Sequence, residues 1–238
     1  MIIELFSKNE SIDISIGHVK LFGDKGNYRL TVEGHEWMSY NTYLEPQPQK
    51  TELFSSYDLA YGDCIVSGLG FGIIANWLAS KPEVKSIKVY EISKDIIELN
   101  RQYNKLHKKI EVINAPIADA RGNKCNCLLL DHYESEDVAY IYRDVKYLSE
   151  IIDCDLVWFW RIEPSLMKWV FTARNLRSME LTHFMLLYKE WRLFLGIDKL
   201  PELSEDKLLE YLSKWPHSYT MRLTDDRKMI SISGPQIL

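Results

Sequence analysis

Short apolar runs alternate with segments of helical periodicity through the middle of this chain. The run Cys64-Ile65-Val66 leads into a glycine-rich turn, and apolar residues then recur at helical spacing over 71–80. Further strand-like runs follow at 86–91, 110–113, 127–130 and 156–160. This alternation of strands and helices predicts an α/β fold, with a mostly parallel sheet and helices on both of its faces.

A different pattern precedes this section, because the first part of the chain is dominated by strand-like runs. Such runs occur at 12–16, 28–32 and 37–40. The segment Glu33-Gly34-His35-Glu36, between the last two, is typical of a hairpin turn. We therefore expect a small β-rich extension over residues 1–60 and one α/β domain over residues 61–238.

Two helices and a hairpin are predicted after the alternating section. Apolar residues over 181–195 form one long helix face. A second helix is expected over 204–215, with Ser204 as its N-cap. We expect these helices to form an insertion over about 179–215, followed by a terminal antiparallel hairpin over about 218–233.

Three glycines at alternate positions follow the first strand of the α/β section: Gly68, Gly70 and Gly72. Glycine lets the backbone approach a ligand where a Cβ would clash, and the start of the next helix presents unpaired N–H groups. The spacing excludes a phosphate-binding P-loop, which needs a Lys-Ser/Thr pair. It also excludes a dinucleotide fingerprint, which needs Gly or Ala where Ile73 stands. A nucleoside site and a tight turn without a ligand both remain open at this point.

Acidic residues follow the next three strands. Glu91 lies about 20 residues beyond the glycines, where an acid accepts hydrogen bonds from both ribose hydroxyls. Asp119 follows the third strand and Asp131 follows the fourth. Each has a structural alternative: Glu91 as a solvated strand end, Asp119 as a turn or cap residue, and Asp131 as the cap of the next helix.

These segments, in this order and at this spacing, resemble the class I S-adenosylmethionine-dependent methyltransferase superfamily. The resemblance covers residues 62–134 and implies a Rossmann-like fold that binds S-adenosylmethionine. It implies that the three glycines approach the methionine and ribose part, that Glu91 holds the ribose, and that Asp119 and Ala120 hold the adenine amino group. The family also places an antiparallel pair at the sheet edge, and the terminal hairpin is the candidate for it.

The segment Asp131-His132-Tyr133-Glu134 stands where this family has its reaction-side motif. It lacks the Asn/Asp-Pro-Pro-Tyr/Phe motif of relatives that methylate amino groups, which argues against a standard base N-methyltransferase. Asp131 and Glu134 also resemble the Asp-x-x-Asp of spermidine synthases, which transfer an aminopropyl group from decarboxylated S-adenosylmethionine. Those enzymes use a Gly-Gly-Gly-Asp-Gly-like loop that this chain lacks. His132 has no identified partner in the sequence and is expected to be a hydrogen-bonded loop histidine.

The resemblance leaves three functions open. The favoured function is methyl transfer from S-adenosylmethionine to an unidentified small-molecule acceptor. The first alternative is aminopropyl transfer to an amine, and the second is a degenerate module that binds the nucleoside or serves in interactions. In both enzymatic readings, Asp131 and Glu134 are the candidate catalytic residues.

The composition is that of an ordinary globular protein, with 46% hydrophobic and 26% charged residues in a chain of 238. A formal net charge of -5 argues against broad nucleic-acid binding, which needs a basic face. No apolar run reaches the ~18 residues of a membrane span, and the start of the chain lacks the pattern of a signal peptide. We therefore expect no membrane partner and a cytoplasmic location.

The chain has four cysteines. Cys64, Cys127 and Cys154 fall at or inside expected core strands, which is typical of reduced, buried thiols in an intracellular protein. The pair Cys125-x-Cys127 lacks a second ligand pair at zinc spacing, so no metal site is expected.

Overall fold

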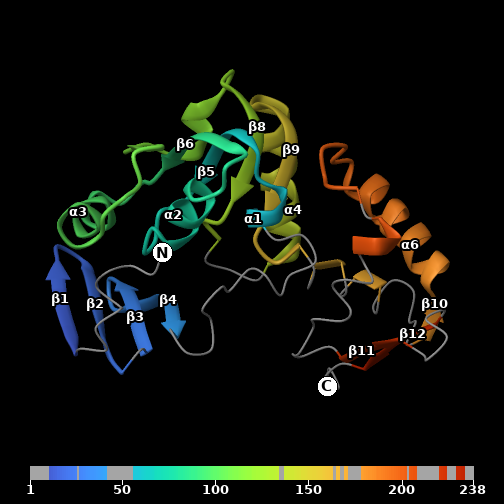
Figure 1. Cartoon of the computed structure of the whole chain (residues 1–238), viewed down its shortest axis with the longest axis horizontal. Coiled ribbons are helices and arrows are strands. Elements are labelled where there is room, and N and C mark those ends of the chain that lie inside the picture. Colours follow the sequence, from blue (N-terminus) through green and yellow to red (C-terminus); the bar gives the residue numbers. More distant parts are fainter. Residues whose placement is uncertain are drawn as a thin grey trace.

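Three β-sheets and the helices between them make up the part of the chain that the computed structural model describes (Figure 1). That part comprises residues 11–25, 27–41, 56–133, 137–162, 165–166, 169–170, 178–202, 204–207, 220–223 and 229–233. The elements up to the third strand of the central sheet are β1 (Ile12–Ile16), β2 (Val19–Asp24), β3 (Asn27–Val32), β4 (His35–Asn41), α1 (Ser56–Leu59), β5 (Gly62–Ser67), α2 (Ile73–Ala79), β6 (Val84–Tyr90), α3 (Lys94–Tyr103) and β7 (Ile110–Ile113). The later elements are the 3-10 helix η2 (Ile117–Ala120), β8 (Lys124–Leu130), α4 (Val138–Ile151), β9 (Asp153–Phe159), β10 (Ser178–Glu180), α6 (Leu181–Leu195), β11 (Thr220–Leu223) and β12 (Met229–Ser233).

The central sheet has five parallel strands in the order β7-β6-β5-β8-β9. β5 and β8, in its middle, are nearly continuous buried runs, because helices cover both faces of a parallel sheet. The chain proceeds from β5 outward to β6 and β7, and then returns to place β8 on the other side of β5. Ligands of open α/β sheets bind at such a reversal, beyond the carboxyl ends of the strands.

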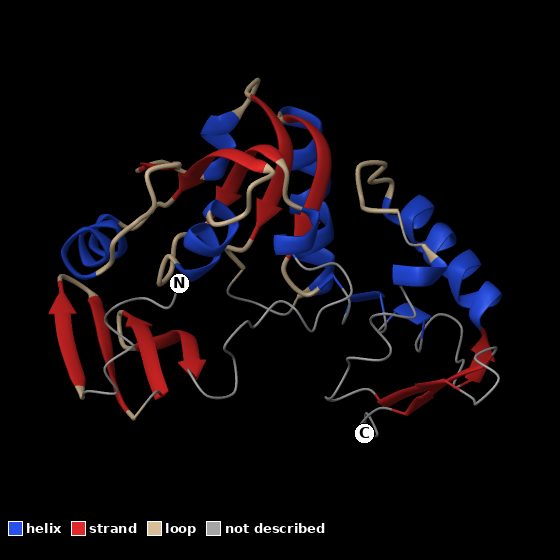
Figure 2. Ribbon diagram, viewed as in Figure 1, coloured by secondary structure: helices blue, strands red, loops and turns tan. Residues whose placement is uncertain are grey.

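Helices flank the central sheet, as Figure 2 shows. Crossovers between parallel strands are right-handed, so α2 and α3 lie on one face and α4 lies on the other. Ser93 is the N-cap of α3, because its hydroxyl accepts a hydrogen bond from the Ile96 N–H at 3.2 Å. α3 ends at Tyr103, because Asn104 has an extended backbone with φ -125°.

The N-terminal strands form an antiparallel sheet in the order β1-β2-β3-β4, in the region predicted to be β-rich. This sheet contacts the first turn of α3, because the His18 N–H donates to Asp95 Oδ2 at 2.9 Å. It also contacts the segment before α2, since a Cβ on Gly70 would lie 2.7 Å from the sulfur of Met38 on β4. The small sheet therefore packs beside the glycine-rich turn (Figure 1).

The C-terminal hairpin is confirmed, but its strands do not extend the central sheet. β12 pairs antiparallel with both β11 and β10, so in the described residues these strands form a separate three-stranded sheet. The outer edge of β9 is taken instead by the segment after α6, because the Val157 N–H donates to the Lys199 carbonyl at 2.9 Å. The expected place of the hairpin, at the sheet edge, is thus corrected: another segment covers that edge.

The aromatic face of α6 belongs to the core. Phe184, Tyr188 and Trp191 are almost completely buried. Tyr142 of α4 lies edge-on to both Phe159 of β9 and Trp191, with ring centroids 6.2 and 6.0 Å apart. These contacts attach α6 to the α4 side of the sheet, and they account for an aromatic stripe without any ligand.

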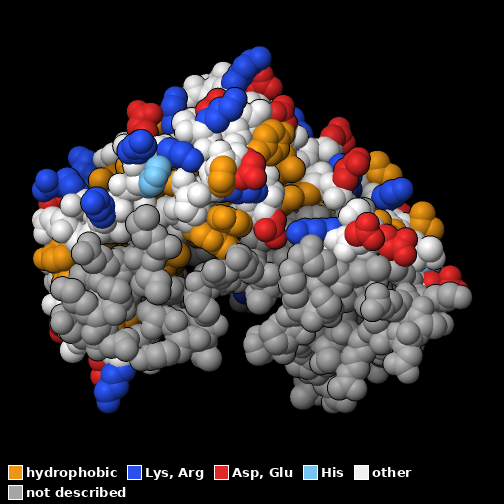
Figure 3. All heavy atoms as spheres, in the orientation of Figure 1, with side chains coloured by type: hydrophobic (Ala, Val, Ile, Leu, Met, Phe, Trp, Pro, Cys, Tyr) orange, Lys and Arg blue, Asp and Glu red, His pale blue; other side chains and the backbone are white. Residues whose placement is uncertain are grey.

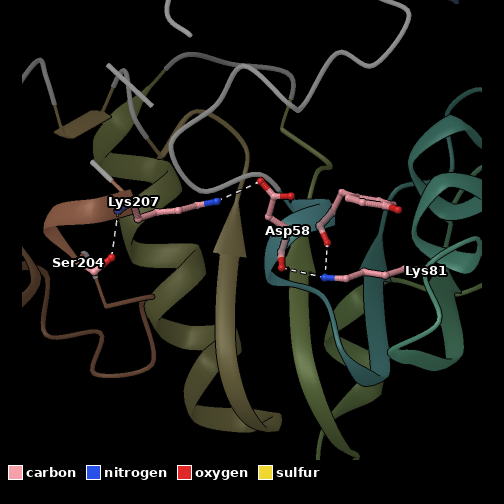
Figure 4. A network of polar contacts seen from close by, with 5 residues as sticks. Asp58, Lys81, Ser204 and Lys207 are labelled. Carbon is pink, nitrogen blue, oxygen red and sulfur yellow. Dashed lines mark hydrogen bonds and ion pairs between the residues drawn. The ribbon is translucent and has the colours of Figure 1, made fainter. Parts of the chain in front are cut away.

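The second expected helix begins as predicted, because the Ser204 hydroxyl accepts from the Lys207 N–H at 3.1 Å. Its remainder, residues 208–215, lies outside the described residues. Lys207 Nζ approaches Asp58 Oδ2 at 3.3 Å, and Lys81 Nζ donates to the Asp58 carbonyl at 2.8 Å (Figure 4). Asp58 of α1 therefore connects the start of this helix with the segment after α2.

All four cysteines are buried free thiols, and Cys125 lies inside β8 as well. In the strand register Cys64 is opposite Cys127, and Cys125 is opposite Cys154. The hydrogen bond with Cys127, together with burial, raises the pKa of Cys64. Such thiols behave as small apolar side chains of the core.

The surface carries charges of both signs. Lys and Arg side chains are interspersed with Asp and Glu over the described elements on the face drawn in Figure 3. Within the described ranges, no helix has both the length and the apolar character that crossing a membrane requires.

Candidate functional site

Three predicted site residues follow directly after strands of the central sheet. Gly68 comes after β5, Glu91 after β6 and Asp131 after β8. The strand ladders continue through them, because the Gly68 N–H donates to the Tyr90 carbonyl at 2.9 Å and the Asp131 N–H donates to the Ser67 carbonyl at 3.2 Å. The structure therefore brings the three residues together at the carboxyl edge of the sheet, where the strand order reverses.

The glycine loop, residues 68–72, lies directly against the segment that follows β8. Gly68 has φ +88°, a conformation that side-chain-bearing residues rarely adopt. A Cβ at this position would collide with the carbonyl oxygen of Asp131. Glycine is thus required here for close approach of two backbones, and this approach places Asp131 beside the loop.

Two asparagines, in α3 and just after it, form hydrogen bonds with carbonyls of the glycine loop. The Asn100 amide donates to the Gly70 carbonyl at 2.8 Å, and the Asn104 amide donates to the Phe71 carbonyl at 2.8 Å. The N–H and C=O of a trans peptide point in opposite directions. The Phe71 N–H, which shares a peptide with the Gly70 carbonyl, therefore points away from Asn100.

Glu91 is only 6% exposed, so it is not a solvated strand end. Its Oε2 accepts from the Leu69 N–H at 2.9 Å, and its Oε1 accepts from the Ser93 N–H at 2.7 Å. The carboxylate thereby joins the glycine loop to the start of α3. An ionised carboxylate has about four acceptor positions, so each oxygen keeps capacity for a ribose hydroxyl.

Asp119 and Ala120 lie in η2, after β7. Asp119 is exposed and no described residue bonds its carboxylate, whereas Ala120 is completely buried. The Asn114 amide donates to the carbonyls of Glu91 and Ile92, at 2.9 and 3.0 Å. The loop that leads to Asp119 is therefore attached to the loop that carries Glu91.

Ile92 adds an apolar surface at the same edge, because its side chain is 70% exposed. An adenosine-type ligand presents hydroxyl and amino donors together with a flat apolar face. Glu91 and Asp119 supply acceptors for such donors, and Ile92 supplies apolar contact between their loops. The residues present therefore fit a ligand of this kind.

Asp131 is half-buried, and protein atoms surround its carboxyl group. Loss of solvation raises the pKa of this carboxyl group to about 7. No described residue donates a hydrogen bond to it. A carboxyl group that ionises near neutral pH is suited to accept a proton during a reaction.

His132, next to Asp131, has a polar partner at each ring nitrogen. Its Nδ1 lies 2.6 Å from Ser67 Oγ, and its Nε2 lies 3.2 Å from Asp144 Oδ2. The Tyr133 hydroxyl donates to the same Asp144 oxygen at 3.1 Å, and its ring lies against that of His132. Burial, followed by the nearby Asp144 carboxylate, raises the pKa of Tyr133, so its hydroxyl remains a donor.

Glu134, the second predicted catalytic residue, lies outside the described residues. In the part of the chain that is described, no group of three or more His, Cys, Asp or Glu side chains is placed to hold a metal ion. Sequence reasoning gave no role to Ser67, Asp144 or Asn100. Two of these residues could have been noticed in the sequence. Ser67 is a polar residue at the end of the apolar strand β5, and Asn100 is a polar residue on the buried face of α3.

The strand arrangement is that of a known fold. Five parallel strands in the order β7-β6-β5-β8-β9, with the glycine loop at the reversal, form a Rossmann-like α/β fold. The fold class predicted from the sequence is thus confirmed.

No family model and no curated protein matches this chain. Among solved structures, spermidine synthase from Thermotoga maritima is similar at 12% identity and a TM-score of 0.46, over 93% of this chain and 73% of that chain. A probable spermidine synthase from Corynebacterium glutamicum is similar at 11% identity and a TM-score of 0.40, over 52% of each chain, so this chain spans about half of its length. A candidate RNA methyltransferase from Pyrococcus horikoshii is similar at 12% identity and a TM-score of 0.35, over 52% of this chain and 61% of that chain. These similarities concern the fold, and the function is argued from the site residues.

Proposed function

We propose that this chain transfers a group from a sulfonium nucleoside of the S-adenosylmethionine type to an amine nitrogen of a small molecule. The observation that carries the proposal is the state and place of Asp131. Its pKa is raised to about 7 by loss of solvation, and its backbone lies in contact range of Gly68 in the glycine loop. A proton acceptor therefore lies beside the loop that would hold the nucleoside.

The nucleoside would be held by acceptors rather than by cations. Glu91, already oriented by two backbone N–H groups, is placed for the ribose hydroxyls. Asp119 has an exposed carboxylate for the adenine amino group, and Ile92 has an exposed apolar side chain for the ring. This set selects an adenosine moiety and contains none of the P-loop features that a triphosphate needs.

The transfer itself needs alignment and removal of a proton. The sulfonium supplies an alkyl group that needs no further activation: the nitrogen–carbon bond forms as the carbon–sulfur bond breaks, and a thioether leaves. An amine reacts through its free lone pair, so its ammonium proton must leave first. Asp131 attracts the ammonium when ionised and takes that proton, and its raised pKa makes it a stronger base than an ordinary aspartate.

Methyl transfer from S-adenosylmethionine is the first candidate reaction, and aminopropyl transfer from decarboxylated S-adenosylmethionine is the second. The second candidate is supported by a further carboxylate, Asp144, which lies within hydrogen-bond distance of the residue after Asp131. Glu134, two residues beyond His132, is expected to add another acid. Several acids at one edge suit a polycationic amine, since each attracts one ammonium group.

Ligand binding by the full chain tests the nucleoside site. Calorimetry with S-adenosylhomocysteine and with both sulfonium donors is expected to detect binding, and Asp119→Asn should weaken it about tenfold, the loss of one charge-assisted hydrogen bond. The Asp119 carboxylate has no hydrogen bond or ion pair within the described chain, so this variant should fold normally. Glu83→Gln, an exposed acid at the opposite end of the sheet, is the matched control and should leave binding unchanged. Absence of binding at millimolar ligand contradicts the proposal.

Turnover with a panel of amines tests the reaction. Mass spectrometry of the products is expected to show a gain of either a methyl or an aminopropyl group, which identifies the donor. Asp131→Asn should lower kcat by about 100-fold or more, since it removes the base, and should leave the affinity for S-adenosylhomocysteine unchanged. In the wild-type chain kcat/KM should rise with pH and level off above about 7, where Asp131 is ionised. Binding without turnover on any amine would instead support the interaction module.

A further inference from the structure

A chain of close polar contacts crosses the carboxyl edge from β5, through the loop after β8, to α4. Ser67, the last residue of β5, is 1% exposed, and its Oγ lies 2.6 Å from His132 Nδ1. The other ring nitrogen, Nε2, lies 3.2 Å from Asp144 Oδ2 on α4. Ser67 Oγ also accepts from the Asp131 N–H at 3.2 Å. The chain of bonds therefore ends at the backbone of the proposed base.

The partners determine which ring nitrogen carries the proton. Asp144 offers a carboxylate, which only accepts, so His132 Nε2 bears the hydrogen. In the neutral form of the ring, Nδ1 is then an acceptor, and it accepts a hydrogen bond from the Ser67 hydroxyl. The lone pairs of Ser67 Oγ remain for the Asp131 N–H. Each of these polar atoms has a partner, as a rigid buried network requires.

The same three residue types form the catalytic triad of serine hydrolases, but their surroundings here exclude that role. The side chain of Ser67 is buried, so its oxygen is closed to a substrate. Its hydroxyl lies at Nδ1 of His132 and the carboxylate lies at Nε2, which reverses the order found in that triad. The network therefore acts on the geometry of the loop and not directly on a substrate.

We propose that His132 is a positioning residue, which holds the Asp131 loop in place by bridging Ser67 to Asp144. That the positioned group, Asp131, is the base of a reaction rests on the proposed function. The network itself does not depend on that function. No described residue donates to the Asp131 carboxyl group, so the backbone around it determines where that group lies. Removing either anchor of His132 frees this backbone and admits water to the carboxyl group.

Three further polar side chains face His132 and Asp131. Among the described residues they are Tyr133 on the loop itself and Asp144 and Tyr140 on α4, with the Tyr140 ring edge-on to that of Tyr133 at 6.3 Å. The Tyr133 hydroxyl donates to Asp144 Oδ2, and His132 Nε2 lies 3.2 Å from the same oxygen. Asp144 is therefore the common partner on α4 for both of these loop side chains.

Titration of the Asp131 carboxyl group tests the proposal without any ligand. Carbon NMR of aspartate-labelled full chain reads this titration, and the Asp131→Asn variant identifies the resonance. His132→Phe, Ser67→Ala and Asp144→Ala are each expected to lower the midpoint by at least one pH unit, a tenfold change in the acid constant, because water reaches the carboxyl group. Asp144→Asn keeps an acceptor oxygen for Nε2 and should retain the wild-type midpoint. His183→Gln, an exposed histidine of α6, is the matched control.

The results separate this proposal from the proposed function. Unchanged midpoints in folded Ser67→Ala and His132→Phe overturn the positioning role. Ser67→Ala removes a single oxygen atom, which protects the test against loss of the fold. In turnover, His132→Phe should lower kcat at least tenfold with the affinity for S-adenosylhomocysteine unchanged. Shifted midpoints in a chain without turnover support the positioning role and contradict the proposed function. Unshifted midpoints in an active chain support the proposed function and contradict the positioning role.

Discussion

Three carboxylates at the carboxyl edge differ in chemistry because their surroundings differ. Glu91 is buried and accepts two backbone N–H groups, which orient it toward the ligand loop. Asp119 is exposed and has no partner in the described chain, so it is available to a ligand. Asp131 has lost solvation without gaining hydrogen bonds, and its pKa rises for that reason. At the scale of single residues, the surroundings of a carboxylate, and not its residue type, determine whether it can bind ribose hydroxyls or act as a base.

The raised pKa of Asp131 makes a prediction about stability. The native chain keeps this proton up to about pH 7, whereas the unfolded chain releases it near the ordinary value of 3.8. Between these values unfolding releases a proton, so the free energy of unfolding falls as pH rises. Asp131→Asn removes the buried charge and should stabilise the protein at pH 8 by on the order of 2 kcal/mol.

Chemical denaturation at several pH values measures this effect. The difference between wild type and Asp131→Asn should disappear below about pH 3, where Asp131 is protonated in both the native and the unfolded state. Glu83→Gln, at an exposed position, should show no such pH dependence. A variant that is no more stable than wild type at pH 8 would show that the carboxyl group is well solvated.

At the scale of elements, the glycine loop takes its form from two neighbours. α3 supplies Asn100, and the segment after it supplies Asn104; both bind carbonyls of the loop. The segment after β8 approaches so closely at Gly68 that no side chain fits. The loop conformation therefore depends on packing against these two segments as much as on its own glycines.

Substitution of Gly68 tests this dependence. Gly68→Ala adds a Cβ at φ +88° that meets the Asp131 carbonyl, so it combines backbone strain with a collision. Gly122→Ala is the matched control, because Gly122 has φ +77° and nothing within 4 Å of the added Cβ. Denaturation should show a loss of about 1–2 kcal/mol for the control and at least about 1 kcal/mol more for Gly68→Ala. Equal losses would mean that the two segments separate at little cost.

At the scale of the whole molecule, polar contacts between described residues join the central sheet and its helices to the segments on either side. On the N-terminal side the His18 N–H donates to Asp95 of α3. On the C-terminal side the Val157 N–H of β9 donates to the Lys199 carbonyl, and Lys207 pairs with Asp58. The Lys207–Asp58 pair is partly exposed, and such pairs contribute about 0–1 kcal/mol.

Removal of Asp95 tests how the N-terminal sheet is attached. Asp95→Ala leaves the His18 N–H without its acceptor and should cost about 1 kcal/mol. Hydrogen exchange should become faster in β1 and β2 and remain unchanged in β5 and β8, because the contact belongs only to the small sheet. Lys207→Ala, at the other attachment, should leave β1 and β2 unaffected. Faster exchange throughout the central sheet would instead show that the two sheets unfold together.

Signals between near neighbours in the chain were sufficient to predict much of the fold. The strand predicted at 110–113 is observed as β7, and the Ser204 hydroxyl caps the helix expected after it, at the Lys207 N–H. Periodicity and capping depend on residues a few positions apart, so a sequence contains them. β2 was not predicted, since its Gly23 and the adjoining turn obscured a short alternation. The place of the hairpin was missed because it depends on which segment reaches the edge of β9.

The sequence by itself determined the order of strands and helices, the glycine loop, and the acids that follow each strand. Only the tertiary structure decided that Ser67, His132 and Asp144 form one network, although the first two lie 65 positions apart in the chain. It also decided that Asp131 loses its solvation while Asp119 keeps it. The reason is physical: a motif specifies which groups are present, whereas solvation and hydrogen bonding between distant residues exist only once the chain has packed.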